Sequence, residues 1–168
     1  VGRNNTGGSV SNSYATGSVI GASFFGGLVG LNSGGSVSHS FWDTQTSGQA
    51  SSDGGMGLTT AQMQTRANFT SATAANGNDN PMWDFATTWV MYEGHTYPLL
   101  RSFMTALTVS ANTVAKTYTG SALNPGVSYS VAPNFSNLFG TVSYSSTPTN
   151  VGAYTIIPGG LYSNQQGY

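Results

Sequence analysis

Single hydrophobic residues alternate with Ser, Gly and Asn through the first part of the chain. Four valines stand 9, 10 and 8 residues apart, and each lies in a short alternating stretch bounded by Gly, Ser or Asn: Val10, Val19, Val29 and Val37. Such a stretch is typical of a short strand followed by a turn. The pattern therefore predicts short strands with the valines facing inward and the small polar residues facing outward.

One seven-residue segment occurs twice in this region, with an offset of 27 residues. Residues 8–14 read GSVSNSY and residues 35–41 read GSVSHSF, and a shorter copy, GSV, occupies residues 17–19. A repeat of this period is typical of a solenoid, in which each repeat forms one coil and neighbouring coils cover one another. We therefore expect residues 7–41 to form coils of a short β-solenoid.

The pattern changes after Phe41 to a turn-rich stretch, a short helix and a hairpin. Thr59 followed by Gln62 forms a capping box and predicts the only helix, which continues toward Arg66. Residues 76–80, NGNDN, indicate an exposed loop. Residues 89–100 predict a β-hairpin with its turn at Glu93 and Gly94, and its aromatic face is expected to cover the last coil.

Alternating runs return from residue 106 onward and indicate a second unit. They are separated by the turn segments NPG, APN, TPTN and PGG. Short strands at regular spacing predict a small antiparallel sheet or an immunoglobulin-like sandwich. The sequence therefore predicts an all-β protein with a solenoid region at 1–105 and a β-rich module at 106–168. We expect this module to be truncated at Tyr168, which would leave an open sheet edge for self-association.

Charge is scarce throughout the chain. Only 5% of the 168 residues are charged, the formal net charge is −1, and there is no Cys. Four Lys and Arg residues do not form the basic stripe that binding to nucleic acid or to an anionic membrane surface requires. No apolar run is long enough to cross a membrane, and no signal peptide is present in this segment. We therefore expect neither nucleic acid binding nor membrane insertion.

Few residues could carry chemistry. His39 and His95 are the only histidines, and no carboxylate stands at a metal-ligand spacing from either. His39 replaces Asn12 of the repeat and is expected at the surface, and no Ser has the frame of a nucleophile elbow. Asp79 in residues 76–80 lacks the rest of a calcium loop. We expect no metal, no cofactor and no enzymatic activity.

Four other carboxylates have two possible roles. Two carboxylates suffice for glycoside cleavage, and the candidates are Asp43, Asp53, Asp84 and Glu93. Capping of turns by these side chains is the interpretation that we favour, because two of them follow Trp in turn-like contexts.

Aromatic residues are the candidates for a binding surface. Exposed rings could stack on sugars, and the candidates are Trp42, Trp83, Trp89, Tyr92 and Tyr97. Aromatic residues at the end of a solenoid more often cover its last coil. Three N-glycosylation sequons begin at Asn4, Asn68 and Asn134, although a chain this rich in Asn, Ser and Thr contains such tripeptides by chance.

Residues 26–32, GGLVGLN, are flanked by the two copies of the seven-residue segment and followed by SFWDT. This arrangement resembles the GLUG repeat of filamentous-haemagglutinin-like bacterial exoproteins of two-partner secretion. Residues 57–63, GLTTAQM, and residues 97–100, YPLL, look like the segment that closes such an array. Residues 107–168, with KTYTG and VGAYTI, resemble the MBG/YDG type of β-rich module, although Thr119 stands where that family more often has Asp.

The resemblance implies a secreted or cell-surface protein that is structural or adhesive, with roles in cell adhesion, biofilm or fibre formation. Its partners would be a host or bacterial surface glycan or protein, or other copies of itself. The same repeats also occur outside the catalytic part of some IgA peptidases. The alternative is therefore a non-catalytic accessory region of a secreted hydrolase.

Overall fold

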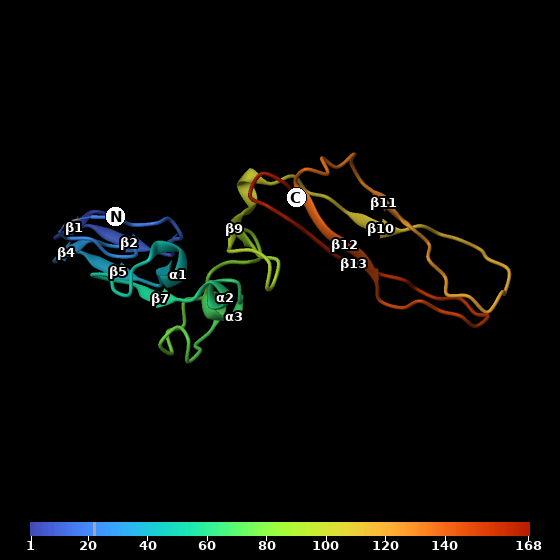
Figure 1. Cartoon of the computed structure of the whole chain (residues 1–168), viewed down its shortest axis with the longest axis horizontal. Helices are drawn as coiled ribbons and strands as arrows, with labels where there is room; N and C mark the ends of the chain where they lie inside the picture. The colour runs from blue at the N-terminus through green and yellow to red at the C-terminus, as the bar shows by residue number, and fades with distance from the viewer. Residues whose placement is uncertain (22) are drawn as a thin grey trace. The chain divides into compact units, whose positions relative to one another are not determined.

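The computed structural model describes residues 1–21 and 23–168. It is mostly β-structure, with 9% of residues in helices, so the predicted all-β class is confirmed. The chain divides into two compact units, Val1–Leu99 (unit 1) and Leu100–Tyr168 (unit 2), which are described separately below (Figure 1).

Unit 1 is built from strands that pair in parallel. A first row holds β1 (Arg3–Asn5), β2 (Ser9–Ser11) and β3 (Tyr14–Ala15), and a second row holds β4 (Leu31–Ser33), β5 (Ser36–Ser38) and β6 (Phe41–Asp43). Each strand of the first row pairs with its counterpart in the second, and β7 (Met56–Leu58) pairs with β6. Val10 lies opposite Val37, 27 residues later. The chain therefore returns to the same place once per sequence repeat (Figure 1).

The repeat extends to backbone conformation and side-chain hydrogen bonds. Asn12 and His39, which occupy the same position of the repeat, both have a φ of 45°. The hydroxyls of Ser13 and Ser40 each donate to the carbonyl two residues earlier, at 2.8 and 2.7 Å. The N–H of Ser13 also donates to the Oγ of Ser40, at 3.2 Å. Equivalent residues therefore adopt equivalent local structure and contact one another between the rows.

The valines of the repeat face the interior of unit 1 to different degrees. Val29 is fully buried, whereas Val10 and Val37 are half-buried and pack against it and its neighbours. Val19 is half-buried. The predicted inward orientation is therefore confirmed for Val10, Val29 and Val37.

Glycine at position 27 allows the backbone to lie directly against the ring of Trp42. A Cβ at Gly27 would overlap the indole ring of Trp42, and Trp42 packs with Leu28 and Val29. Any larger residue at this position would push the ring away from the two rows.

Short helices join and follow the strands of unit 1. They are α1 (Thr44–Ser47), α2 (Thr60–Met63) and α3 (Ala67–Thr70), and a 3₁₀ turn, η1 (Arg101–Phe103), opens unit 2. The predicted capping box at the start of α2 is confirmed, because the Thr59 and Gln62 side chains each accept from the other residue's N–H. The expectation of a single helix that continues toward Arg66 is wrong. The side chain of Asn68 donates to the carbonyl of Gln62, and the chain turns before α3.

The predicted aromatic hairpin is present at the end of unit 1. β8 (Trp89–Val90) and β9 (Leu99–Leu100) form a two-stranded sheet. Gly94 has a φ of 72°, and the N–H of His95 donates to the carbonyl of Tyr92 at 2.9 Å. The turn therefore lies at Glu93 and Gly94, as the sequence predicts.

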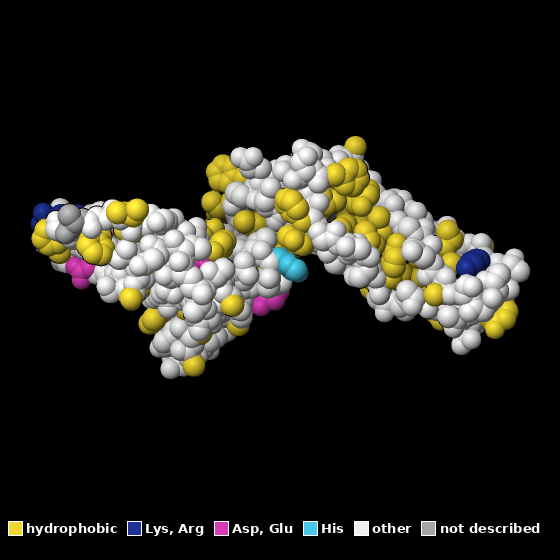
Figure 2. Space-filling view, viewed as in Figure 1, with side chains coloured by type: hydrophobic (Ala, Val, Ile, Leu, Met, Phe, Trp, Pro, Cys, Tyr) yellow, Lys and Arg dark blue, Asp and Glu magenta, His cyan; other side chains and the backbone are white. Residues whose placement is uncertain are grey.

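Unit 2 contains two small antiparallel sheets. β10 (Val109–Ala111) pairs with β11 (Val127–Tyr129), and β12 (Leu138–Tyr144) pairs with β13 (Pro158–Ser163). The alternating runs at residues 114–118 and 154–157 form no strand, contrary to the prediction. No Val, Ile, Leu, Met or aromatic side chain in the described residues 101–168 is buried, and hydrophobic side chains gather along unit 2 on the face shown in Figure 2.

Candidate functional site: an aromatic cap around Asp43

Asp43 lies at the end of β6 and is fully buried. Its Oδ1 accepts hydrogen bonds from the backbone N–H groups of Gln45 (2.8 Å) and Thr46 (3.0 Å), which makes it the N-cap of α1. Its Oδ2 accepts from the hydroxyls of Thr60 (2.7 Å) and Tyr97 (2.8 Å). One carboxylate therefore holds together α1, α2 and the hairpin.

These hydrogen bonds decide the ionisation of the cluster. Burial disfavours the charged form of Asp43, but the hydrogen bonds from Thr60, Thr46, Tyr97 and Gln45 outweigh burial and hold the pKa of Asp43 below its ordinary value. Burial, and then the hydrogen bond to Asp43, raise the pKa of Tyr97. The stable state of the site is therefore a carboxylate that accepts from a neutral phenol.

A cluster of aromatic rings is linked to this carboxylate through the hydroxyl of Tyr97. The rings in mutual contact are Tyr14, Phe41, Phe69, Trp83, Phe85, Trp89 and Tyr97. Trp83 is central, with its ring 4.7 Å from Trp89 in a stacked arrangement and 4.9 Å from Phe69. The hydroxyl of Tyr14 donates to the carbonyl of Pro98 at 2.7 Å, which ties the hairpin to the first row. We call this set the aromatic cap.

Three of the five predicted binding residues, Trp83, Trp89 and Tyr97, belong to the aromatic cap. Trp42 is 6% exposed and Trp83 is 4% exposed, and their indole N–H groups donate to backbone carbonyls within unit 1. Sugar stacking, the alternative for exposed rings, is therefore wrong for these two residues, because they are buried within unit 1. Trp89, Tyr92 and Tyr97 are half-buried, so only one part of each ring is accessible to a ligand.

Of the remaining candidate carboxylates, Asp84 caps a turn, as the favoured interpretation predicts, whereas Asp53 and Glu93 accept from backbone N–H groups that are distant in sequence. Asp53 accepts from the N–H of Asn32 at 2.6 Å. Glu93 accepts from the N–H of Arg66 at 3.1 Å. Asp84 accepts from the N–H groups of residues 86 and 87 at 2.8 and 3.0 Å, and hydrogen bonds from the side chain and then the backbone of Thr87 lower the pKa of Asp84.

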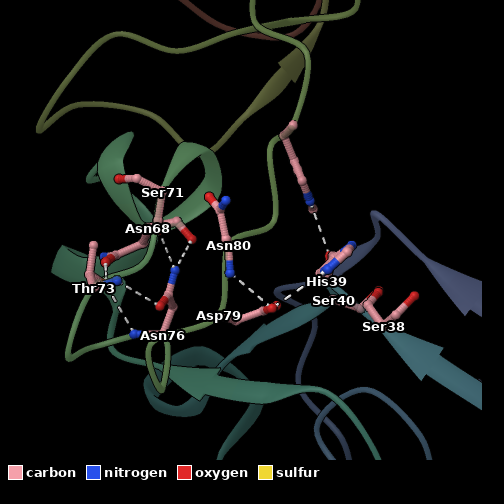
Figure 3. A network of polar contacts seen from close by, with 10 residues as sticks. Ser38, His39, Ser40, Asn68, Ser71, Thr73, Asn76, Asp79 and Asn80 are labelled. Atoms are coloured by element: carbon pink, nitrogen blue, oxygen red, sulfur yellow. Dashed lines mark hydrogen bonds and ion pairs between the residues drawn. The ribbon is translucent and has the colours of Figure 1, made fainter.

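A polar network orders the loop that follows α3 (Figure 3). Asn76 is fully buried, which corrects the expectation that all of residues 76–80 form an exposed loop. Its Nδ2 donates to the carbonyls of Asn68 (2.9 Å) and Ser71 (2.8 Å), and its Oδ1 accepts from the N–H of Thr73 (3.0 Å). The side chain of Asn76 thereby replaces backbone partners that the tight loop lacks.

The two histidines occupy different surroundings. The Nε2 of His39 lies 3.5 Å from Asp79, both side chains are about two-fifths exposed, and the carbonyl of His39 accepts from Trp83. His95 is exposed in the hairpin turn. Within residues 1–21 and 23–168, no three His, Asp or Glu side chains are close enough together to hold a metal ion. None of the helices in the same residues has the length and apolar character that a membrane span requires.

Comparison of the chain with protein-family models, with curated proteins and with solved structures gives no match. The assignment of a function therefore depends on the features of this chain alone.

The Asp43 cluster is the main feature that the sequence analysis does not predict. A local indication of the cap is present, since Asp followed by Thr-Gln-Thr is a favourable N-cap arrangement. The other two partners, Thr60 and Tyr97, lie 17 and 54 residues away in sequence. Only the three-dimensional arrangement identifies them.

Proposed function

We propose that this chain is an extracellular structural and adhesive segment of a bacterial surface or secreted protein. Unit 1 is a short β-solenoid in which each row of strands, with its loops, is one coil. Unit 2 is an immunoglobulin-like or β-sheet module of the kind that follows such solenoids. The segment itself carries no catalysis.

The observation that carries the proposal is the parallel pairing of the two rows in register with the sequence repeat. Val10 opposite Val37 and Tyr14 opposite Phe41 place equivalent residues directly over one another. Each added repeat adds one layer and buries the apolar residues of the previous layer, so length is obtained by repetition. A stiff, extendable element suits a stalk that presents a binding surface away from the cell.

The surface supports the same interpretation. Only 5% of the residues are charged, and charged side chains occupy only a few small areas of the face shown in Figure 2. Hydroxyl and amide groups on an ordered backbone suit contacts with glycans, proteins or other copies of the chain. Electrostatic attraction over long distances contributes little.

Adhesion of chain-coated beads tests the proposal. Beads that carry the full chain are mixed with epithelial cells, immobilised glycans and beads of the same kind, and attachment is counted under flow. Val29→Asp is the matched control, because it places a charge at a fully buried position of the solenoid. We expect the wild-type chain to hold beads on at least one of these surfaces, and circular dichroism verifies which variant is folded.

Equal attachment of wild-type beads and uncoated beads on every surface would contradict an adhesive role. The reading frame that encodes the parent protein then separates the two remaining possibilities. A zinc-protease motif in that frame favours the accessory region of a hydrolase, whereas a secretion domain with further β-modules favours a structural stalk.

A further inference from the structure

The three sequons of the chain differ in the environment of their asparagines. They occupy residues 4–6, 68–70 and 134–136, and all three have the Asn-X-Ser/Thr pattern. Transfer of a sugar requires the amide nitrogen of the Asn to reach a glycosyltransferase, with the hydroxyl of the third residue accessible as well. Burial and hydrogen bonding of the three asparagines therefore decide which sequon can react in the folded chain.

Two of the asparagines are part of the folded interior. Asn4 is 6% exposed, and its Nδ2 donates to the Oδ1 of Asn32 (3.1 Å) and to the carbonyl of Ser36 (3.0 Å). Asn68 is 3% exposed, and its Nδ2 donates to the carbonyl of Gln62 (2.8 Å). Either side chain would have to break these bonds and leave the interior before it could react.

Asn134 is exposed at a turn of unit 2. Its Oδ1 accepts from the N–H of Ser136 and its carbonyl accepts from the N–H of Asn137, both at 3.0 Å, and its N–H donates to the hydroxyl of Tyr168. In the described part of the chain, the Nδ2 of Asn134 donates no hydrogen bond. Phe135 is 67% exposed and Ser136 is exposed as well. The turn is therefore held by its backbone and by the amide oxygen, and the amide nitrogen is left accessible.

We propose that Asn134 is a site of N-glycosylation in the folded chain and that Asn4 and Asn68 are not. The donor is a sugar whose anomeric carbon carries a diphosphate leaving group. The Nδ2 of Asn134 forms a bond to that carbon, the bond from the carbon to the diphosphate oxygen breaks, and one amide proton passes to a base of the transferase. No group is oxidised or reduced.

The test uses the purified, folded full chain. One sample receives a soluble N-glycosyltransferase that recognises Asn-X-Ser/Thr, with UDP-glucose as donor. A second sample receives a membrane oligosaccharyltransferase with a lipid-diphosphate-linked oligosaccharide, so the two arms distinguish the source of the sugar. Three synthetic peptides, each spanning one sequon, show what the same enzymes do without a fold. Mass spectrometry of proteolytic fragments locates the sugar.

We expect the sugar at Asn134 of the folded chain in at least one arm, with Asn4 and Asn68 unmodified although their peptides react. Absence of sugar at Asn134 in both arms overturns the proposal, as does modification of Asn4 or Asn68 in the folded chain at the rate of Asn134. Ser136→Ala removes the sequon hydroxyl and leaves Asn134 exposed, so it should abolish modification completely. Phe135→Ala keeps the sequon and should preserve it.

Discussion

The hydroxyl of Tyr97 donates a hydrogen bond of 2.8 Å to the carboxylate of Asp43, across 54 residues of sequence. This contact joins the aromatic hairpin to the end of β6. Asp43 also caps α1 and accepts from Thr60 of α2. The Asp43 carboxylate therefore connects α1, α2 and the hairpin, which share no continuous secondary structure. The position of the hairpin of the aromatic cap next to β6 therefore depends on a single buried carboxylate.

Replacement of Asp43 by Ala should therefore destabilise the chain more than replacement of any other carboxylate. The change removes an N-cap and leaves the hydroxyls of Thr60 and Tyr97 without their acceptor. We expect a loss of about 2–4 kcal/mol in the free energy of unfolding, measured by urea denaturation. Asp53→Ala is the control, because Asp53 is exposed, and its loss should cost less than about 1 kcal/mol. Equal losses for the two variants would contradict the central role of Asp43.

The same carboxylate should make the fold sensitive to acid. The pKa of Asp43 is lowered in the folded chain, so the unfolded chain binds more protons in the pH range between the folded and unfolded values. The contribution of Asp43 to stability is therefore complete above its ordinary pKa of about 4 and is lost as the pH falls through the lower, folded pKa. Unfolding experiments from pH 5 down to pH 2 should show this decline for the wild type. The decline should be much smaller for Asp43→Asn, and an unchanged decline in that variant would assign it to other groups.

Trp83 should be the most important ring of the aromatic cap for stability. It is 4% exposed, lies in contact with four other rings of the cap, and donates to the carbonyl of His39. Trp83→Ala leaves a large cavity and should cost about 3–5 kcal/mol. Trp83→Phe keeps most of the ring volume and loses the hydrogen bond, so its cost should be about 1–2 kcal/mol. If the two variants were equally stable in chemical denaturation, the packing of this ring would be unimportant.

The repeated backbone conformation at Asn12 and His39 leads to a further prediction. Both residues have a φ of 45°, which Asn tolerates and a β-branched residue does not. Asn12→Val should lower the free energy of unfolding by about 1–2 kcal/mol, whereas Asn12→Gly should change it by less than about 1 kcal/mol. Thermal unfolding followed by circular dichroism ranks the variants. A Val variant as stable as the Gly variant would exclude this backbone conformation.

Features specified locally or by repetition can be predicted from the sequence. The capping box at Thr59 and Gln62 needs only residues three apart. The pairing of Val10 with Val37 agrees with the sequence repeat, in which these residues occupy the same position of two similar segments. The hairpin turn is indicated by Gly94, which supplies the positive φ that the turn requires.

Features that depend on distant partners cannot be predicted in this way. Asp43 is followed by a helix of four residues, which is too short to give hydrophobic periodicity, and its other partners come from later segments. The runs at residues 114–118 and 154–157 alternate as strands do, yet they have no pairing partner. Val114, Tyr118 and Tyr154 line a groove in unit 2 instead. A strand requires a partner as well as a pattern.

The most direct test of the central claim measures the register between the two rows of unit 1. The chain has no Cys, so the pair Ser11→Cys and Ser38→Cys introduces two thiols at positions that lie directly opposite each other. Neighbouring strands are about 4.8 Å apart, which is within the range of a disulfide. In the mismatched pair, Ser11→Cys and Ser36→Cys, the second thiol is displaced by two residues along the strand. Under mild oxidation, the parallel pairing predicts a rapid intramolecular disulfide in the matched pair and little in the mismatched pair. Equal rates for the two folded variants, or a faster reaction of the mismatched pair, would contradict the stacked arrangement.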